Sequence, residues 1–250
     1  WFEHVLLNCD AIACISRAVA DEFVDWLRAH DRIPPTQMRL GWFPLGADFR
    51  APTSLAPSRQ AQALVADQTP FFLSVGTIEP RKAYPVALAA FEKLWAEGCD
   101  ARYVIVGRPG WKTSVLQKNI RRHAEYGRRL FWFADAGDAD LRLLYGHAQA
   151  LVFPSFVEGF GMPLVEAAHY GVATIASDIP VFREIGGDNV RYFSLLDSDD
   201  LARAVRETLA APVRPAPPET IGWRAAATTV AQMIMNAAYQ LDAAQLRKRL

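Results

Sequence analysis

From about Gln68 onwards, short apolar runs alternate with longer segments in which apolar residues recur every three or four positions. The short runs are typical of strands buried on both faces, and the longer segments are typical of helices that cover such strands. This alternation predicts an α/β fold, a Rossmann-like doubly wound parallel sheet. The expected strands are residues 70–75, 102–106, 130–133, 150–153 and 172–176, and the expected helices are residues 85–97, 113–127, 138–147, 161–170 and 199–209.

The flanks of this alternating region carry further elements. A strand-like run at residues 9–15 leads into an amphipathic helix at residues 17–30, which Ser16 is expected to cap. The proline-rich stretch at residues 211–218 predicts an extended connector, because proline fixes φ and lacks a backbone donor. A last helix is expected after Trp223, with an apolar stripe formed by Val230, Ile234, Ala237 and Leu241.

Composition limits the class of protein and says little about the reaction that it performs. The 250 residues are 51% hydrophobic, which is enough for one large core. The 27 basic residues cancel the 27 acidic ones, so no overall charge favours nucleic acid as a partner. Cys9, Cys14 and Cys99 lack metal-ligand spacing, and we expect buried, structural thiols in a reducing compartment. Without a signal peptide or an apolar run near the roughly 20 residues of a membrane span, we expect a cytoplasmic protein.

The strongest chemical signal is a glycine turn between two carboxylates. Glu158 falls in a loop after a buried strand, and Glu166 falls in the helix expected at residues 161–170. The first amides of a helix lack internal partners and lie at its positive end, so they suit a phosphate. The two carboxylates can accept hydrogen bonds from hydroxyl pairs, so the stretch predicts a nucleotide sugar as ligand. The predicted donor-binding residues here are Gly159, Phe160, Gly161, Met162, Leu164 and Glu166.

Two further loops are expected at the same edge of the sheet, where the carboxyl ends of parallel strands meet. Gly76 and Gly107 each follow a predicted strand, and Arg108 comes next in the second loop. Arg81 and Lys82 follow shortly after Gly76. A guanidinium forms bidentate contacts with phosphate and an ammonium is a compact charge, so the pair suits a departing diphosphate. We predict Arg81 and Lys82 as catalytic cations and the other three residues as donor contacts.

Other interpretations are weighed against this one. Either glutamate could be a solvated helix-end residue, and Arg81 with Lys82 could be a surface pair. Glycoside hydrolases also use two carboxylates, but theirs face each other across a sugar, about 5 to 9.5 Å apart. The chain has no GxGxxG motif, which counts against a nicotinamide or flavin enzyme. We expect no cofactor and no metal, no catalytic histidine, and Trp111 as the tryptophan best placed to touch ligand.

These motifs resemble the retaining glycosyltransferases of family 4, also called group 1, which have the two-domain GT-B fold. Their signature of a glutamate, seven residues and a second glutamate matches Glu158 to Glu166. The sequence from Gly76 to Lys82 is similar to the family's glycine loop and basic pair. The resemblance covers roughly residues 38–250 and departs from the family at Ala83, where members usually carry Gly or Asn.

The resemblance implies a domain organisation. Residues 1–45 would be the remnant of the N-terminal acceptor domain with the interdomain crossing. Residues 46–210 would be the nucleotide-sugar-binding domain, and residues 211–250 a connector with a C-terminal helix. Most of the acceptor domain is expected to be missing, so the missing N-terminal domain of the same protein is an expected partner. Whether this chain is active without it stays open.

The resemblance also implies a retaining hexosyltransferase that moves a sugar from a nucleoside-diphosphate sugar to a glycan or lipid-linked saccharide acceptor. Glu158 would hold the sugar hydroxyls as a catalytic residue, and Glu166 would grip the ribose. The motifs are most similar to bacterial mannosyl- or rhamnosyltransferases of polysaccharide biosynthesis, which are cytoplasmic or peripheral at the inner face of the membrane. A non-catalytic nucleotide-sugar-binding module and a GT-B epimerase or phosphorylase are the alternatives, and the donor base stays open.

Overall fold

The computed structural model describes residues 2–48, 56–211 and 221–250. The connector expected at residues 211–218 therefore lies outside the described residues except for Ala211. The chain divides into two compact units, one formed by Trp1–Phe49 with Glu219–Leu250 and the other by Arg50–Pro218. Each unit is described by itself.

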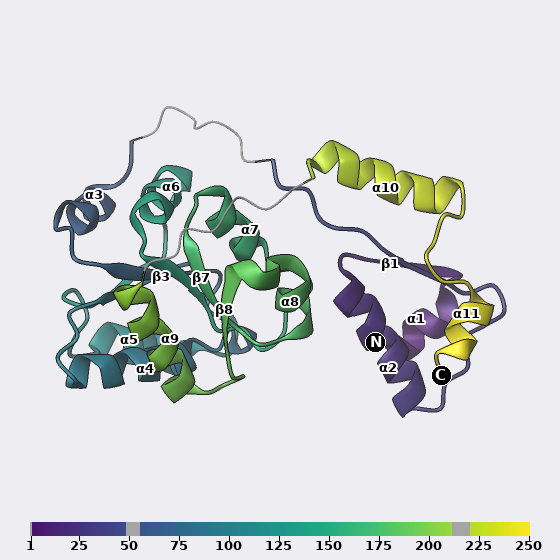
Figure 1. Cartoon of the computed structure of the whole chain (residues 1–250), viewed down its shortest axis with the longest axis horizontal. Coiled ribbons are helices and arrows are strands. Elements are labelled where there is room, and N and C mark those ends of the chain that lie inside the picture. The colour runs from purple at the N-terminus through teal and green to yellow at the C-terminus, as the bar shows by residue number, and fades with distance from the viewer. Residues whose placement is uncertain (1, 49–55, 212–220) are drawn as a thin grey trace. The chain divides into compact units, whose positions relative to one another are not determined.

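The larger unit is built on a six-stranded sheet in which every neighbouring pair is parallel (Figure 1). Because the chain first adds strands on one side of β3 and then returns to add β6 on the other side, the strand order reverses between β3 and β6. Ligands of doubly wound sheets bind at the carboxyl ends of the two strands that flank such a switch point. The strand order is β5 (Leu130–Phe133), β4 (Arg102–Val106), β3 (Phe71–Val75), β6 (Ala150–Phe153), β7 (Ala173–Ser177) and β8 (Val190–Phe193).

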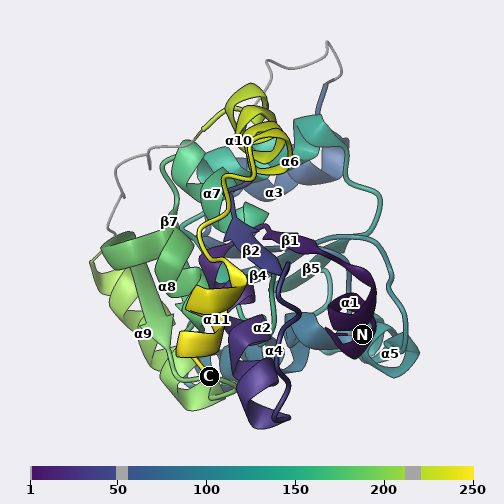
Figure 2. The ribbon, with the colours of Figure 1, turned by 90° about the vertical axis from the view of Figure 1, so that its right-hand side faces the viewer.

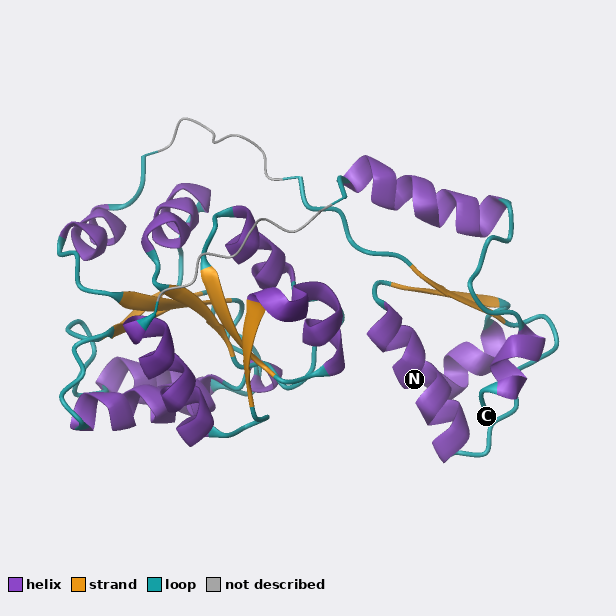
Figure 3. Cartoon of the chain, in the orientation of Figure 1, coloured by secondary structure: helices purple, strands orange, loops and turns teal. Residues whose placement is uncertain are grey.

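Helices cover both faces of this sheet, as the fold class predicted (Figures 1 and 3). In the orientation that these figures share, one set lies above the strands and the other below them. Contacts between α3 and α6 and between α4 and α9 agree with the two layers. The upper layer contains α3 (Arg59–Ala66), α6 (Asp138–His147) and α7 (Met162–His169), the lower layer contains α4 (Tyr84–Ala96), α5 (Ser114–Arg122) and α9 (Ser198–Ala210), and α8 (Pro180–Gly186) follows β7.

The main core lies between the lower helices and the sheet. Phe91 of α4 is fully buried and stacks on Tyr103 of β4, with ring centroids 4.6 Å apart. Trp95 and Trp132 are 6% and 5% exposed, which confirms that both are core residues. Each large side chain buried in this way contributes about 1.5 to 3 kcal/mol. Apolar packing of the lower helices therefore stabilises the sheet that carries the switch point.

The smaller unit has its own core. Its strands β1 (Ala11–Cys14) and β2 (Arg39–Trp42) are parallel, and Ser16 caps α2 (Arg17–Ala29) by accepting a hydrogen bond from the Val19 amide, as predicted. Figure 2 turns this unit toward the viewer. Its remaining helices are α1 (Phe2–Asn8), α10 (Trp223–Met235) and α11 (Ala243–Lys248).

Some predicted elements were wrong in extent. Helix α5 ends at Arg122 and not at residue 127, because His123 takes an extended conformation and begins a turn. The stripe expected on the last helix is wrong as well. The helix ends at Met235, Ile234 is 65% exposed, and its buried residues are Ala226 and Met233. Leu241 is buried outside this helix, where it bridges to Leu40 of β2 and packs in the core of the smaller unit.

The cysteines also differ from the expectation. The three thiols are free, but Cys9 is exposed, Cys14 is buried and Cys99 is half-buried. Cys9 is the residue after α1 and precedes the strand that was expected to bury it, since β1 begins two residues later at Ala11. Burial raises the pKa of the Cys14 thiol to about 11. Cys14 is therefore the inert apolar residue that was predicted, and Cys9 is not.

Candidate functional site

Three charged side chains meet at the carboxyl ends of β3 and β6. Arg81 and Lys82 lie in a 3₁₀ turn (Pro80–Lys82) that follows β3, and Glu158 lies in the loop after β6. Arg81 Nη1 is 2.7 Å from Glu158 Oε2, and Lys82 Nζ is 2.6 Å from Glu158 Oε1. The structure thus brings together the three residues that the sequence predicted as catalytic. It also shows a direct ion pair that the sequence did not predict.

The Glu158 carboxylate is enclosed and is compensated by charge. Its side chain is 9% exposed, as is that of Lys82. Oε1 is itself buried, and the Lys82 ammonium lies 2.6 Å from it. Removing either partner would leave the other charge buried without compensation, which is costly in folded proteins.

The two cations differ in their electrostatic environment. Burial lowers the pKa of Lys82, and the attraction of Glu158 opposes this effect without cancelling it. Burial also acts to lower the pKa of Arg81, but its ion pairs with Glu158 and Glu79 outweigh burial and leave that pKa raised. Lys82 also lies 4.8 Å from the centroid of the Phe153 ring. Lys82 is therefore the less hydrated cation, which gains most from a second anion.

Two glycines allow the strand-end loops to approach each other. Gly76 has φ +143°, and a Cβ there would lie 3.1 Å from Lys82 Cε, so the absent side chain leaves room for the lysine stem. A Cβ at Gly107 would lie 1.9 Å from the Gly76 carbonyl oxygen. No side chain fits at that distance. Packing therefore requires glycine at Gly107, whereas at Gly76 the positive φ favours it.

The start of α7 lies beside Glu158 in the sequence and presents free amides. Gly161 has φ +98°, a left-handed conformation that glycine adopts without strain, and a Cβ there would lie 3.1 Å from Leu164 Cδ1. Pro163 occupies the first turn, as expected. Among the residues that the structure describes, the amides of Phe160, Gly161 and Met162 donate to no backbone acceptor. These amides can accommodate an anion.

Glu166 lies within α7 and is held by a buried tyrosine. The Tyr145 hydroxyl donates a hydrogen bond of 2.8 Å to Glu166 Oε2. Burial raises the pKa of Glu166, and the Tyr145 hydrogen bond and the charge of Lys82 act against it. Both carboxylates of the motif are therefore within electrostatic reach of the Lys82 ammonium.

The remaining predicted residues lie in the loop after β4, in the loop after β6 and in the first turn of α7. Arg108 is exposed, and its carbonyl accepts a 2.9 Å hydrogen bond from the Ile78 amide. Gly159 and Met162 are half-buried in the loop and first turn of α7. Trp111 is 57% exposed, and the Lys112 ammonium lies 5.4 Å from the centroid of its ring. Their roles as ligand contacts stay predictions.

Three residues of the site were not predicted from the sequence. The Tyr84 hydroxyl donates a 2.6 Å hydrogen bond to the Gly76 carbonyl and so holds the loop after β3 in place. Glu79 accepts a 3.0 Å hydrogen bond from Arg81 Nε. Both lie within three residues of the basic pair, so a closer inspection of that segment could have suggested them. Tyr145 is 21 residues from Glu166, and no spacing in the sequence links the two.

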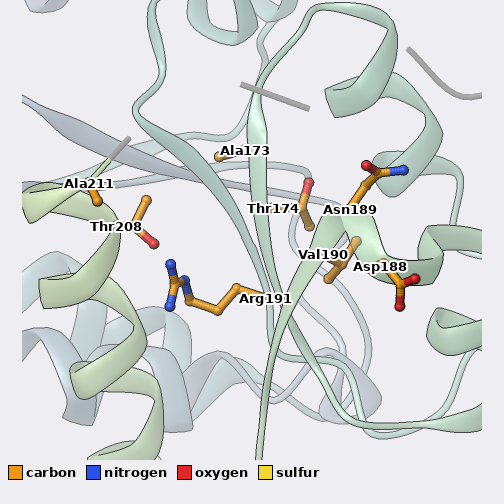
Figure 4. Close-up of a pocket in the computed structure, with 8 residues that line it drawn as sticks. All are labelled: Ala173, Thr174, Asp188, Asn189, Val190, Arg191, Thr208 and Ala211. Carbon is orange, nitrogen blue, oxygen red and sulfur yellow. The ribbon is translucent and has the colours of Figure 1, made fainter. Parts of the chain in front are cut away.

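Two cavities lie outside this cluster. One, of about 300 Å³, is at the amino ends of β7 and β8, the opposite edge of the sheet, and Thr174 and Arg191 line it (Figure 4). The other, of about 520 Å³, lies between α4 and α5 and reaches Glu79. None of the predicted site residues lines either cavity.

The described residues contain no group of three or more His, Cys, Asp and Glu side chains arranged to hold a metal ion. None of the helices in the described ranges is long and apolar enough to cross a membrane.

Comparison with known proteins assigns the family. Residues 57–220, most of the chain, match the family described as "Glycosyl transferases group 1". The chain belongs to this family. The resemblance inferred from the Glu158–Glu166 motif is thereby confirmed.

Relatives and solved structures agree with the assignment. The chain is 40% identical over 231 residues to the serotype-specific mannosyltransferase WbdA of Escherichia coli. The aligned region covers 89% of this chain and 28% of the relative. It is 33% identical to the O-antigen chain mannosyltransferase B of Escherichia coli over 64% of this chain and 42% of that protein. The chain thus spans about a quarter to two fifths of the length of these relatives.

The fold is similar to that of solved glycosyltransferase structures. Sucrose-phosphate synthase from Thermosynechococcus elongatus superposes with a TM-score of 0.70 at 22% identity, over 94% of this chain and 60% of that one. The trehalose-6-phosphate synthase OtsA superposes with a TM-score of 0.67 at 15% identity, over 84% of this chain and 54% of that one. At these identities the likeness shows the fold alone, and it confirms the predicted α/β, GT-B-type architecture.

Proposed function

We propose that this chain is the donor-binding part of a retaining hexosyltransferase of polysaccharide biosynthesis. It would bind a nucleoside-diphosphate sugar, and the whole protein would transfer the sugar to a glycan or lipid-linked acceptor. Both relatives are named as mannosyltransferases, one of them of O-antigen, which favours mannose as the sugar and transfer over epimerisation or phosphorolysis. We expect the protein to act in the cytoplasm or at the inner face of the membrane.

The observation that supports the proposal best is the position of the charged cluster. Arg81, Lys82 and Glu158 lie at the switch point of a doubly wound sheet, beside the free amides that open α7. Departure of a nucleoside diphosphate builds negative charge on the leaving phosphate, and pre-aimed cations and amides lower that barrier. The proposal needs no metal, because these groups supply the positive charge.

Glu158 is proposed to hold the sugar and not to attack it. Both of its oxygens lie within 2.7 Å of a cation, and such contacts reduce the nucleophilicity of a carboxylate. A carboxylate so placed can still accept hydrogen bonds from sugar hydroxyls as the cations turn to the diphosphate. This arrangement supports retention without a covalent intermediate on Glu158.

Titration calorimetry with GDP, UDP and ADP tests the proposal. We expect at least one to bind, and Lys82→Ala and Glu166→Ala each to weaken it by about tenfold or more, because each removes a charged hydrogen-bond partner. Arg206→Ala is the control, since Arg206 forms an exposed ion pair with Glu97 on another part of the unit. Wild-type affinity in both site variants would contradict the assignment.

A further inference from the structure

Tyr145 and Glu166 form a buried pair that links two helices. Tyr145 comes from the last turn of α6 and is fully buried, and its hydroxyl donates to Oε2 of Glu166 in α7. Its ring also stacks on Tyr170, with centroids 5.3 Å apart and planes inclined by 13°. The phenol is therefore fixed by packing on its faces and by a hydrogen bond at its tip.

The hydrogen bond leaves the two carboxylate oxygens unequal. Oε2 is occupied by Tyr145, whereas Oε1 has no hydrogen bond to the residues that the structure describes. Oε1 is also absent from the buried acceptors without a partner, and Glu166 is only half-buried. One oxygen is thus reserved for the protein, and the other stays accessible to a ligand.

The phenol suits this task chemically. Burial and the neighbouring Glu166 raise the pKa of the Tyr145 hydroxyl well above its usual value, so it remains a donor throughout the physiological range. A freely rotating carboxylate loses side-chain entropy when it binds a hydroxyl pair, which weakens binding. A carboxylate that is already fixed avoids this loss. Supporting hydrogen bonds of this type hold functional side chains within the narrow geometry that recognition requires.

We propose that Tyr145 is a positioning residue for ribose recognition. By holding Oε2, it aims Oε1 of Glu166 at the ribose hydroxyls of the nucleotide, and it thereby sets how strongly the site prefers a ribonucleotide over a dideoxyribonucleotide. The inference rests on the proposed function and adds a residue that no motif of the family assignment includes.

A purely structural tyrosine would behave differently. If Tyr145 served only to fill the space between α6 and α7, removing its hydroxyl would weaken every ligand of the site to the same extent or none. If it aims Glu166, the loss falls on ligands that carry the ribose hydroxyls. The preference between the two ligands is therefore the quantity to measure.

The test uses the nucleoside diphosphate that binds the wild-type chain among GDP, UDP and ADP, together with its 2′,3′-dideoxy form. The variant is Tyr145→Phe, which retains the ring and its stacking on Tyr170. We expect the variant to bind the ribonucleotide roughly three- to tenfold more weakly, the effect of one hydrogen bond, and the dideoxy form with unchanged affinity. In the background of Glu166→Ala, which removes the acceptor, adding Tyr145→Phe should change neither affinity.

Tyr103→Phe is the matched control. Tyr103 is also fully buried, and its hydroxyl donates a 2.9 Å hydrogen bond to Ser74 of β3 and not to Glu166. Its loss should leave the preference for ribose as it is in the wild type. Thermal unfolding of each variant shows that the chain is folded before titration.

Three outcomes would overturn the inference. Equal weakening of both ligands in Tyr145→Phe would assign a structural role, and unchanged affinity for both would show that the hydroxyl does not matter. In either case the proposed function would stand, because the wild-type chain binds. A folded wild-type chain that bound no nucleoside diphosphate would overturn the proposed function and this inference together.

Discussion

Glu158 contacts the two cations that the proposed function assigns to the diphosphate. Its two oxygens lie 2.7 Å from Arg81 Nη1 and 2.6 Å from Lys82 Nζ. Under that proposal, a diphosphate would displace the carboxylate or share the cations with it. Such competition would lower the affinity for the diphosphate and would release Glu158 toward the sugar when the diphosphate binds.

Replacing Glu158 by Gln tests this competition. The two cations lose their internal counter-ion, so we expect Glu158→Gln to bind a nucleoside diphosphate several-fold more tightly and to lose most sugar transfer. We also expect a loss of stability of about 3 to 5 kcal/mol, because the buried Lys82 loses its ionic partner. Titration calorimetry, a transfer assay on the complete protein and thermal unfolding measure the three effects.

Two comparisons sharpen this test. Adding pyrophosphate should raise the melting temperature of Glu158→Gln by more than it raises that of the wild type, because pyrophosphate replaces the missing anion. Glu97→Gln should change none of the three quantities, since Glu97 pairs with Arg206 at an exposed surface. Weaker nucleotide binding by Glu158→Gln would show that the carboxylate assists the diphosphate and does not compete with it.

The sequence predicted the proximity of two kinds of residues in this site. Some are close along the chain, and others follow adjacent parallel strands. Arg81 and Lys82 follow β3 directly, and Glu158 follows β6, so the meeting of parallel strand ends predicted their proximity. Tyr145 could not be found in this way, because its contact with Glu166 depends on how α6 and α7 pack. The ion pair itself was also beyond prediction, since side-chain direction does not follow from spacing.

At the scale of the elements, the junction between the 3₁₀ turn and α4 carries local strain. Ala83 ends that turn and precedes α4 with φ +46° and ψ 35°, the left-handed conformation. A side chain in this region costs roughly 1 to 2 kcal/mol, which explains why the family usually has Gly or Asn there. Ala83 keeps the turn geometry nevertheless, because Tyr84 ties the loop to Gly76.

Ala83→Gly should therefore stabilise the protein by about 0.5 to 1 kcal/mol, the relief of strain less the added flexibility of the unfolded chain. Denaturant unfolding measures the change. Ala89→Gly, at a half-buried position inside α4, is the control and should destabilise by about 1 kcal/mol. A destabilising effect of Ala83→Gly would show that the methyl group contributes packing that exceeds its strain.

The elements themselves were predicted unevenly, for physical reasons. Buried parallel strands are continuous apolar runs, and β4, β5 and β6 begin and end at the expected residues. Strand β8 was missed because only Phe193 of its four residues is buried, so its pattern is weak. Helix α11 was missed because a turn at Ala237, with φ +51°, separates it from α10.

For the molecule as a whole, the division into two units separates the site from the flanks. Each contact of Arg81, Lys82, Glu158 and Glu166 that the structure shows is made within the unit Arg50–Pro218. The sequence predicted the α/β class of this unit from its alternation alone. It could not predict that residues at both ends of the chain form one core, because their pairing through Leu40 and Leu241 is not local.

A polypeptide of residues 50–218 should accordingly fold and bind the same nucleoside diphosphate within about threefold of the whole chain. A domain of this size buries about 70% of the surface of its unfolded chain, enough for an independent core. Circular dichroism with thermal unfolding establishes the fold, and titration calorimetry compares the affinities. Because the Lys82→Ala change should weaken binding equally in both polypeptides, it verifies that the same site is measured. A folded polypeptide that did not bind would show that the smaller unit supplies part of the nucleotide site, and the donor-binding function would then belong to the two units together.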